Sequence, residues 1–290
     1  MKVCYLIVSD SFDKNKSIIE KPLEEELEDL LQVLEMIDEE ETVFYMNDLF
    51  HQNIDENVTF SQWLFNSSSR HDSRRLMQIK FRGMKELEPS DYQQKMLSIE
   101  NKIYEHPVVM LPFYKWTNIK IEGVLIVNNQ LDYLKANRFY LSLTNDLTLF
   151  IKNSNKCFPQ LYINDSVQQR MKKLKPFRNY IGEIIIHLSV LNDYGHKVFN
   201  EFRSQSENTV LRHLGIIGDI HCSPQGDPAY EKANLTFEFP KDDGGTVEII
   251  CAPHTKLFKK HSGERIYFHW GHPEVSEGKK LLVGHIGEHL

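Results

Sequence analysis

Short apolar runs and amphipathic stretches alternate along the first part of the chain. Residues 3–8 (VCYLIV) form a continuous apolar run rich in β-branched residues, which is typical of a strand covered on both faces. From Pro22 onward, leucines recur at three- and four-residue steps and acidic residues come early, which predicts a helix that begins near this proline. Residues 42–46 (TVFYM) predict the next strand, and 106–114 and 121–129 hold two further apolar runs of strand type.

A polar stretch without periodicity, NSSSRHDSRR (66–75), interrupts this pattern and predicts a surface loop. The strand, helix, strand order at the start of the chain lacks a glycine-rich phosphate loop, so nucleotide binding has little support. We therefore expect residues 1–130 to form a mixed α/β region with a regulatory or partner-binding role.

The middle of the chain predicts helices. Apolar residues recur at helical spacing in 137–154, 167–175 and 179–204. A short helix is expected at 206–215, because this stretch starts with a serine and ends with a glycine. Residues 131–218 are therefore expected to form a helical region.

The C-terminal third predicts a sheet. Turn signals, among them DDGG (242–245), separate short runs in which apolar and polar residues alternate or all residues are apolar. The strand-like runs are 235–239, 245–258, 265–270 and 279–290. Residues 219–290 are expected to form an antiparallel sheet that carries the functional site, and the fold class is predicted to be α+β, with this sheet packed on the preceding helices.

Composition narrows the class of protein. The 290 residues are 41% apolar and 26% charged, as in an ordinary globular protein, and the net charge of −7 excludes a basic coat for nucleic acid but not a local basic cleft. The cysteines are scattered and predict neither a zinc ribbon nor a disulfide framework, which favours a reducing compartment. The apolar start is too short to span a membrane, so we expect a cytoplasmic protein with no membrane partner.

Histidines cluster near the C-terminus: of the 13 in the chain, six lie in 254–290. Side chains two residues apart on a strand share a face. If neighbouring strands come into register, one face of the sheet carries His254, Lys256, Arg265, Tyr267, His269, His285 and His289. The glycines on either side of His285 would allow a backbone or a ligand to approach it closely.

This set of side chains favours RNA cleavage without a metal ion. A histidine can take a proton from a 2′-hydroxyl or give one to a leaving oxygen, and Lys or Arg can stabilise the charge on phosphate. His254 or His285 is the expected general base, and His269 or His289 the expected acid. Lys256 and Arg265 would steady the phosphate. Further substrate contacts are expected from Tyr267 and from the basic cluster Lys172, Lys173, Lys175 and Arg178.

The late strands also carry a resemblance, in HTK (254–256), RIYFH (265–269) and GHIGEHL (284–290). Helices followed by such a sheet resemble the RelE/ParE/HigB superfamily of bacterial toxins, whose RNase members cleave mRNA with basic residues and His or Tyr on the sheet. The strands are also similar to those of uncharacterised bacterial proteins, often encoded beside phage-defence genes, with an HTK, RI(Y/H)FH and C-terminal HL pattern. The resemblance implies a RelE-like sheet, an RNA substrate (mRNA or tRNA), an antitoxin or defence-system partner, and no cofactor.

Two alternatives remain open at this point. Cys251-x-x-His254 and His269-x-x-His272 have zinc-ligand spacing, which would suit a zinc-dependent nuclease, although residues three apart on a regular strand point to opposite faces. We therefore expect no metal ion at the site. In the second alternative the protein is a non-enzymatic, partner-binding subunit of a defence complex, and the histidines have a structural role.

Overall fold

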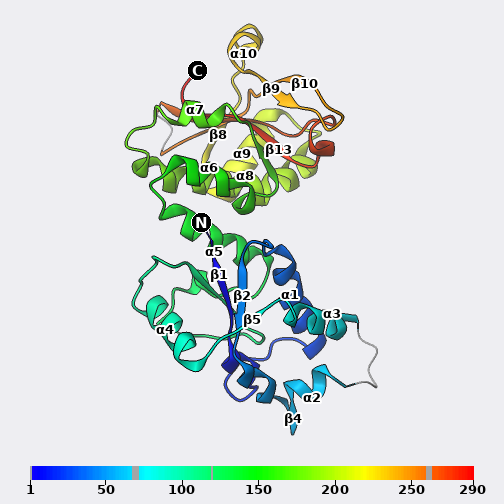
Figure 1. Cartoon of the computed structure of the whole chain (residues 1–290). Coiled ribbons are helices and arrows are strands. Elements are labelled where there is room, and N and C mark those ends of the chain that lie inside the picture. The colour runs from blue at the N-terminus through cyan, green and yellow to red at the C-terminus, as the bar shows by residue number, and fades with distance from the viewer. Residues whose placement is uncertain (1, 67–71, 119, 259–262) are drawn as a thin grey trace. The chain divides into compact units, whose positions relative to one another are not determined.

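The described chain divides into two compact units, each with a hydrophobic core (Figure 1). The computed structural model describes residues 2–66, 72–118, 120–258 and 263–290. The units are Met1–Tyr140 and Leu141–Leu290. The helices expected in 131–218 therefore lie mostly in the same unit as the C-terminal sheet. Within the described ranges, no helix is both long enough and apolar enough to cross a membrane.

The N-terminal unit is built on a parallel sheet in the order β5-β2-β1-β6. Its strands are β1 (Cys4–Ile7), β2 (Thr42–Tyr45), β5 (Lys85–Glu86) and β6 (Val108–Leu111). The strands predicted in 3–8, 42–46 and 106–114 are confirmed. The run 121–129 instead forms a 3-10 turn, η3 (Gly123–Leu125), and only a single parallel bridge joins Ile126 to Met110.

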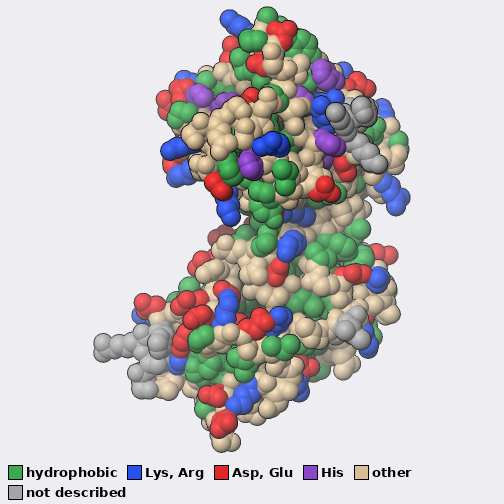
Figure 2. Space-filling view, turned by 180° about the vertical axis from the view of Figure 1, so that it is seen from behind, with side chains coloured by type: hydrophobic (Ala, Val, Ile, Leu, Met, Phe, Trp, Pro, Cys, Tyr) green, Lys and Arg blue, Asp and Glu red, His purple; other side chains and the backbone are tan. Residues whose placement is uncertain are grey.

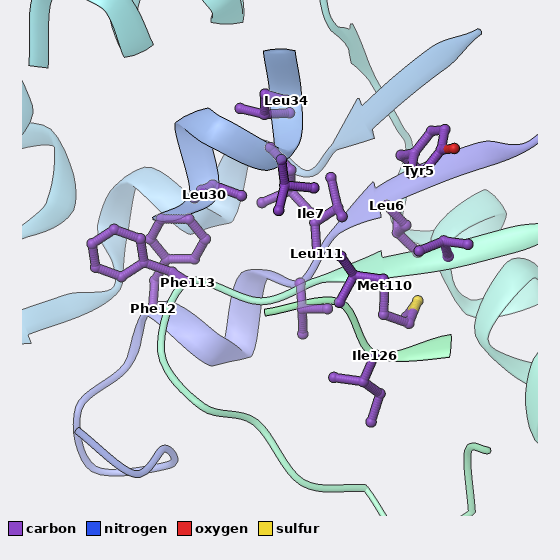
Figure 3. Packing of buried hydrophobic residues seen from close by; sticks show 14 of the residues in the cluster. Tyr5, Leu6, Ile7, Phe12, Leu30, Leu34, Met110, Leu111, Phe113 and Ile126 are labelled. Carbon is purple, nitrogen blue, oxygen red and sulfur yellow. The ribbon is translucent and has the colours of Figure 1, made fainter. Parts of the chain in front are cut away.

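Helices pack on this sheet because its central strand is apolar on both faces. Tyr5, Leu6 and Ile7 of β1 are fully buried, and Leu30 and Leu34 of α1 lie over them in the core (Figure 3). The helices are α1 (Leu23–Met36), α2 (Phe60–Leu64), α3 (Asp72–Phe81), α4 (Pro89–Glu100) and α5 (Gln130–Ser142), with the 3-10 segments η1 (Ser9–Phe12) and η2 (Asn47–His51) and the small hairpin β3 (Asn53–Asp55) and β4 (Val58–Thr59).

The loop predicted at 66–75 lies partly outside the described residues. Residues 67–71 lie outside the described residues, and Asp72 already begins α3.

The C-terminal unit contains a mixed sheet in the order β7-β13-β12-β11-β8. Its strands are β7 (Leu161–Ile163), β8 (His221–Ser223), β11 (His254–Lys256), β12 (Glu264–His269) and β13 (Leu281–Glu288), and a separate hairpin is formed by β9 (Thr236–Pro240) and β10 (Thr246–Ile250). The α+β assignment agrees with this architecture. The sheet differs from the predicted antiparallel one in two ways. β7 pairs in parallel with β13, after a crossover through helices, and among the described strands β9 and β10 pair only with each other.

Helices cover one face of this sheet. Ile266, Phe268 and Trp270 share a core with Ile184 and Leu188 of α8, as the alternation of apolar residues in the third strand predicts. The helices of this unit are α6 (Leu147–Cys157), α7 (Val167–Met171), α8 (Arg178–Phe202), α9 (Glu207–Gly218) and α10 (Pro228–Asn234), with the 3-10 segment η4 (Ser276–Gly278). Of these, α10 lies with the β9–β10 hairpin on the other side, where its Tyr230 packs against the hairpin's core cluster.

The opposite face is covered by the β9–β10 hairpin. Phe237 and Ile249 of the hairpin share a core cluster with Tyr267 and Leu282 of the sheet. The hairpin sits so close to β13 that a Cβ added at Gly284 would lie 2.5 Å from the Phe237 ring. Glycine is therefore required by space at this position.

Replacing Gly284 by alanine is expected to lower the free energy of unfolding by about 1–3 kcal/mol, because the hairpin must move to admit the methyl group. Urea denaturation of the full chain measures the change. Gly263→Ala is the matched control, because an added Cβ there meets nothing within 4 Å. Equal stability of the two variants would contradict this packing of Phe237 on β13.

Candidate functional site

Two rows of side chains cross the C-terminal sheet on the face under the β9–β10 hairpin. Residues directly opposite each other on neighbouring strands point to the same side. In the first row, His254 of β11 lies between Ser223 of β8 and Tyr267 of β12. Tyr267 in turn lies opposite His285 of β13. These four residues are called the histidine row below.

The second row lies one step along the strands and carries positive charge. Lys256 lies between His221 and Arg265, and Arg265 lies opposite Gly287. We call these four residues the basic row. The two rows together contain five of the seven side chains predicted for this face: His254, Lys256, Arg265, Tyr267 and His285.

This face is much less accessible than an open catalytic surface. His254 is only 4% exposed, His285 3% and Tyr267 0%. Lys256 is half-buried and His289 is exposed, so the polar groups that water reaches lie at the rim. Figure 2 shows histidine and basic side chains at the surface of this unit beside apolar side chains.

Both ring nitrogens of His254 have partners within the protein. Nδ1 lies 3.3 Å from the carbonyl oxygen of Ala252, and Nε2 lies 3.0 Å from Ser223 Oγ. A carbonyl oxygen can only accept, so Nδ1 carries the hydrogen and Nε2 accepts the hydrogen bond from the serine hydroxyl. Burial, together with Arg265 and Lys256, lowers the pKa of His254 to about 4, so the ring is neutral at pH 7.

Tyr267 connects the two histidines of the row. Its ring centroid lies 4.9 Å from that of His254 and 5.7 Å from that of His285. His289 packs edge-on against the same tyrosine at 6.3 Å and also lies 6.4 Å from Tyr230 of α10. Burial raises the pKa of Tyr267 to about 12, so this hydroxyl remains protonated at neutral pH.

His285 has one ring nitrogen engaged and one without a partner. Nε2–H donates to the Glu288 carbonyl oxygen at 2.8 Å, which leaves a lone pair on Nδ1. Among the described residues, no group forms a hydrogen bond with this buried Nδ1. Burial, together with Arg170 and Lys173, lowers the pKa of His285 to about 4, so this lone pair is present at pH 7.

Gly287 makes the orientation of His285 possible. The ring folds back over this glycine to reach Glu288, and a Cβ added at Gly287 would lie 3.1 Å from ring atoms Cε1 and Nε2. Close approach of a backbone or a ligand is the expected role of the glycines on either side of His285. At Gly284 the approaching group is the side chain of Phe237, and at Gly287 it is the ring of His285 itself.

Part of the predicted basic cluster lies next to His285. Lys173 acts on this histidine together with Arg170, a residue of α7 that the sequence analysis did not single out. The Arg170 guanidinium lies over the Phe237 ring, with 5.2 Å from Cζ to the centroid. Lys172 donates to Gln169 within the same segment.

The remaining two members of that cluster, Lys175 and Arg178, are exposed on the segment that leads into α8.

Of the two predicted proton donors, His289 lies against Tyr267. His269 pairs with Leu282, beyond a bulge in the β12–β13 pairing, and accepts a hydrogen bond from Gly271 N–H at 3.3 Å. Burial and nearby His272 lower the pKa of His269. The structure therefore makes His289 the better placed candidate for the acid.

The site also contains three residues that the sequence did not predict: Ser223, Arg170 and Tyr230. Ser223 and Tyr230 fall in the stretch 221–234, whose Pro, Gly and Ser residues are typical of a loop but which contains β8 and α10. A usable signal was present, because Asp227 followed by Pro228 is typical of a helix start, and Asp227 does accept from Ala229 N–H at 3.0 Å.

The zinc-ligand spacings do not assemble into a metal site in the part of the chain that is described. No group of three or more His, Cys, Asp or Glu side chains is placed there to hold one ion. Cys251 is buried against Gly284, and burial keeps its thiol protonated by raising its pKa. Comparisons of the chain with protein-family models, with curated proteins and with solved structures give no match.

Proposed function

We propose that this protein is a metal-independent ribonuclease, an effector of a bacterial toxin or phage-defence system. The observation that carries the proposal is the lone pair of His285 Nδ1, which has no partner among the described residues and lies near Arg170 and Lys173. A neutral histidine nitrogen next to cations suits a substrate that presents a hydroxyl donor beside a phosphate. The 2′-hydroxyl and the adjoining phosphodiester of RNA have this chemistry.

In the proposed reaction, His285 Nδ1 accepts the proton of the 2′-hydroxyl. The 2′-oxygen attacks phosphorus, and the bond from phosphorus to the 5′-oxygen of the next nucleotide breaks. His289 gives a proton to that leaving oxygen, and the products are a 2′,3′-cyclic phosphate and a 5′-hydroxyl end. Arg170, Lys173 and the cations of the basic row stabilise the charge that develops on the phosphate oxygens.

His254 has a different part in this scheme. Its two ring nitrogens are already occupied by Ser223 and Ala252, so it is not free to accept the proton of the 2′-hydroxyl. It packs against Tyr267, which in turn contacts His285. We therefore assign the general base to His285 and regard His254 as a positioning residue in RNA cleavage.

The fold and the partner proposals follow from the resemblance to RelE-like toxins and defence-associated proteins. A RelE-like arrangement is proposed for the sheet of β11, β12 and β13, with mRNA or tRNA as the RNA. An antitoxin or a defence-system protein would bind the chain, and the N-terminal unit is the proposed regulatory or partner-binding part.

Cleavage of RNA but not of DNA is the expected result when the purified full-length protein is incubated with matched single-stranded oligonucleotides in excess EDTA. The reason is that the proposed nucleophile is the 2′-oxygen. A DNA strand with one ribonucleotide should be cut only after that nucleotide, and mass spectrometry should find a 2′,3′-cyclic phosphate. Intact RNA, or cleavage abolished by EDTA, would contradict the proposal.

The burial of His254 and His285 favours one alternative, in which the histidines are structural and the protein is a binding subunit. In that case the full-length protein leaves RNA intact, while His285→Gln still weakens the fold. Activity and stability must therefore be measured on the same preparations.

A further inference from the structure

A second reactive arrangement lies at the other end of the histidine row. We infer that Ser223 is a nucleophile activated by His254, and that the pair attacks a phosphate diester through a covalent phosphoserine intermediate. This activity does not rest on the proposed ribonuclease activity, because it needs neither His285 nor a 2′-hydroxyl.

The hydrogen bonds around Ser223 have the order required of a nucleophile and its base. The serine hydroxyl donates to His254 Nε2 at 3.0 Å, and the opposite ring nitrogen donates to the Ala252 carbonyl oxygen at 3.3 Å. A nucleophile within hydrogen-bond reach of a base, with the base oriented by a third group, is the arrangement by which serine is activated in covalent catalysis. The backbone carbonyl of Ala252 fixes the tautomer in which Nε2 can accept a proton.

The fold holds this pair in place and leaves the nucleophile accessible. His254 is buried, whereas Ser223 is half-buried on β8, which is the edge strand of the sheet in the described chain. Pairing of β8 with β11 sets Ser223 directly opposite His254. The serine can therefore meet a substrate at the edge of the sheet while the base remains shielded from water.

Charge on the same face selects the class of electrophile. Lys256 and Arg265 are near enough to His254 to act on its charge, and they occupy the next row of the same face. Attack on a phosphate diester builds negative charge on phosphoryl oxygens, which such cations stabilise. A neutral carboxylic ester carries less negative charge for these two cations to bind, so the phosphate diester is the inferred substrate class.

The inferred step balances without a co-reactant. Ser223 Oγ forms a bond to phosphorus as its proton passes to His254 Nε2, the bond from phosphorus to the leaving oxygen breaks, and that oxygen takes the proton from His254. Water then attacks phosphorus and gives a proton to His254 Nε2, the bond from phosphorus to Ser223 Oγ breaks, and His254 returns this proton to the serine oxygen. The product is a phosphate monoester.

An alkyl fluorophosphonate tests the inference on the full-length protein, since it traps an activated serine by losing fluoride. The expected result is one adduct, mapped by peptide mass spectrometry to the peptide with Ser223. Ser206 is the internal control, because its hydroxyl forms a hydrogen bond with the Thr209 hydroxyl at 2.9 Å. His254→Asn should slow labelling of Ser223 by about 100-fold.

Each outcome decides the inference. No adduct at Ser223 on the wild-type protein, or an adduct at Ser206 as fast as at Ser223, overturns it, and neither result depends on whether a variant folds. Labelling of Ser223 that His254→Asn leaves unchanged removes His254 as the base. His272→Gln, which lies outside both rows, should leave the labelling rate unchanged. Labelling is measured without RNA, so failure of the ribonuclease proposal and failure of this inference are distinguishable.

Discussion

His285→Gln is expected to lower the rate of RNA cleavage by about 10²–10⁴-fold, the usual contribution of a general base. Glutamine keeps a polar side chain of similar length but cannot take up the proton of the 2′-hydroxyl. Single-turnover cleavage of an RNA oligonucleotide at saturating protein measures the loss in the chemical step. The Michaelis constant should change little, because Arg170 and Lys173 remain.

His272→Gln is the matched control for this variant. His272 lies in the turn after β12, and its Nδ1 accepts from Glu274 N–H at 3.3 Å. It is outside both rows, so its replacement should leave cleavage within about twofold of wild type. If His254→Gln abolished cleavage while His285→Gln did not, the base would have to be reassigned to His254.

Acid should destabilise the C-terminal unit through the same two histidines. His254 and His285 have pKa values of about 4 in the folded chain, below the ordinary value of about 6.5 for an unfolded histidine. The unfolded chain therefore binds more protons between these values. The contribution of the two neutral rings to the free energy of unfolding is fully present above pH 6.5. It is lost as the pH falls to 4, and the loss is about 3 kcal/mol for each ring.

Urea denaturation at several pH values between 7 and 4 measures this loss. Carboxylates also titrate near the lower end of the range, so the comparison must be with the His254→Gln, His285→Gln double variant. The double variant should show a smaller decline of the free energy of unfolding than the wild type. Identical slopes would mean that neither histidine is buried and neutral in the folded chain.

The sequence predicted strands and the main helices well where one physical signal dominates. The apolar run of β1, the leucine spacing of α1 and the alternation of Ile266 and Phe268 all reflect burial of a single face or of both faces. Strand parity likewise placed His254, Tyr267 and Arg265 on one face. These features depend on neighbours in the sequence, and they can be read from it.

Features that depend on distant contacts were not predictable in this way. The parallel pairing of β7 with β13 joins segments more than a hundred residues apart, and no local pattern encodes it. The burial of the histidines comes from the β9–β10 hairpin, whose Phe237 folds over β13. The Ser223–His254 hydrogen bond requires β8, a strand too short to give a periodic signal.

Parity correctly placed His285 and Gly287 opposite Tyr267 and Arg265, but a bulge in β13 breaks the alternation before His285. Leu281, Val283 and Ile286 face the helices, so the alternation changes phase between Val283 and Ile286. Tyr267 pairs with His285 and Phe268 with Val283, which leaves Gly284 without an opposite residue.

The unpaired Gly284 gives β13 a single position at which its length can change. Loss of this residue would return the strand to simple alternation and keep Val283 and Ile286 on the helix side, with His285 still facing Tyr267. Loss or gain of a residue elsewhere in β13 would turn either the apolar side chains or the histidine to the wrong face. We therefore expect β13 to tolerate a change of length at Gly284 and at no other position.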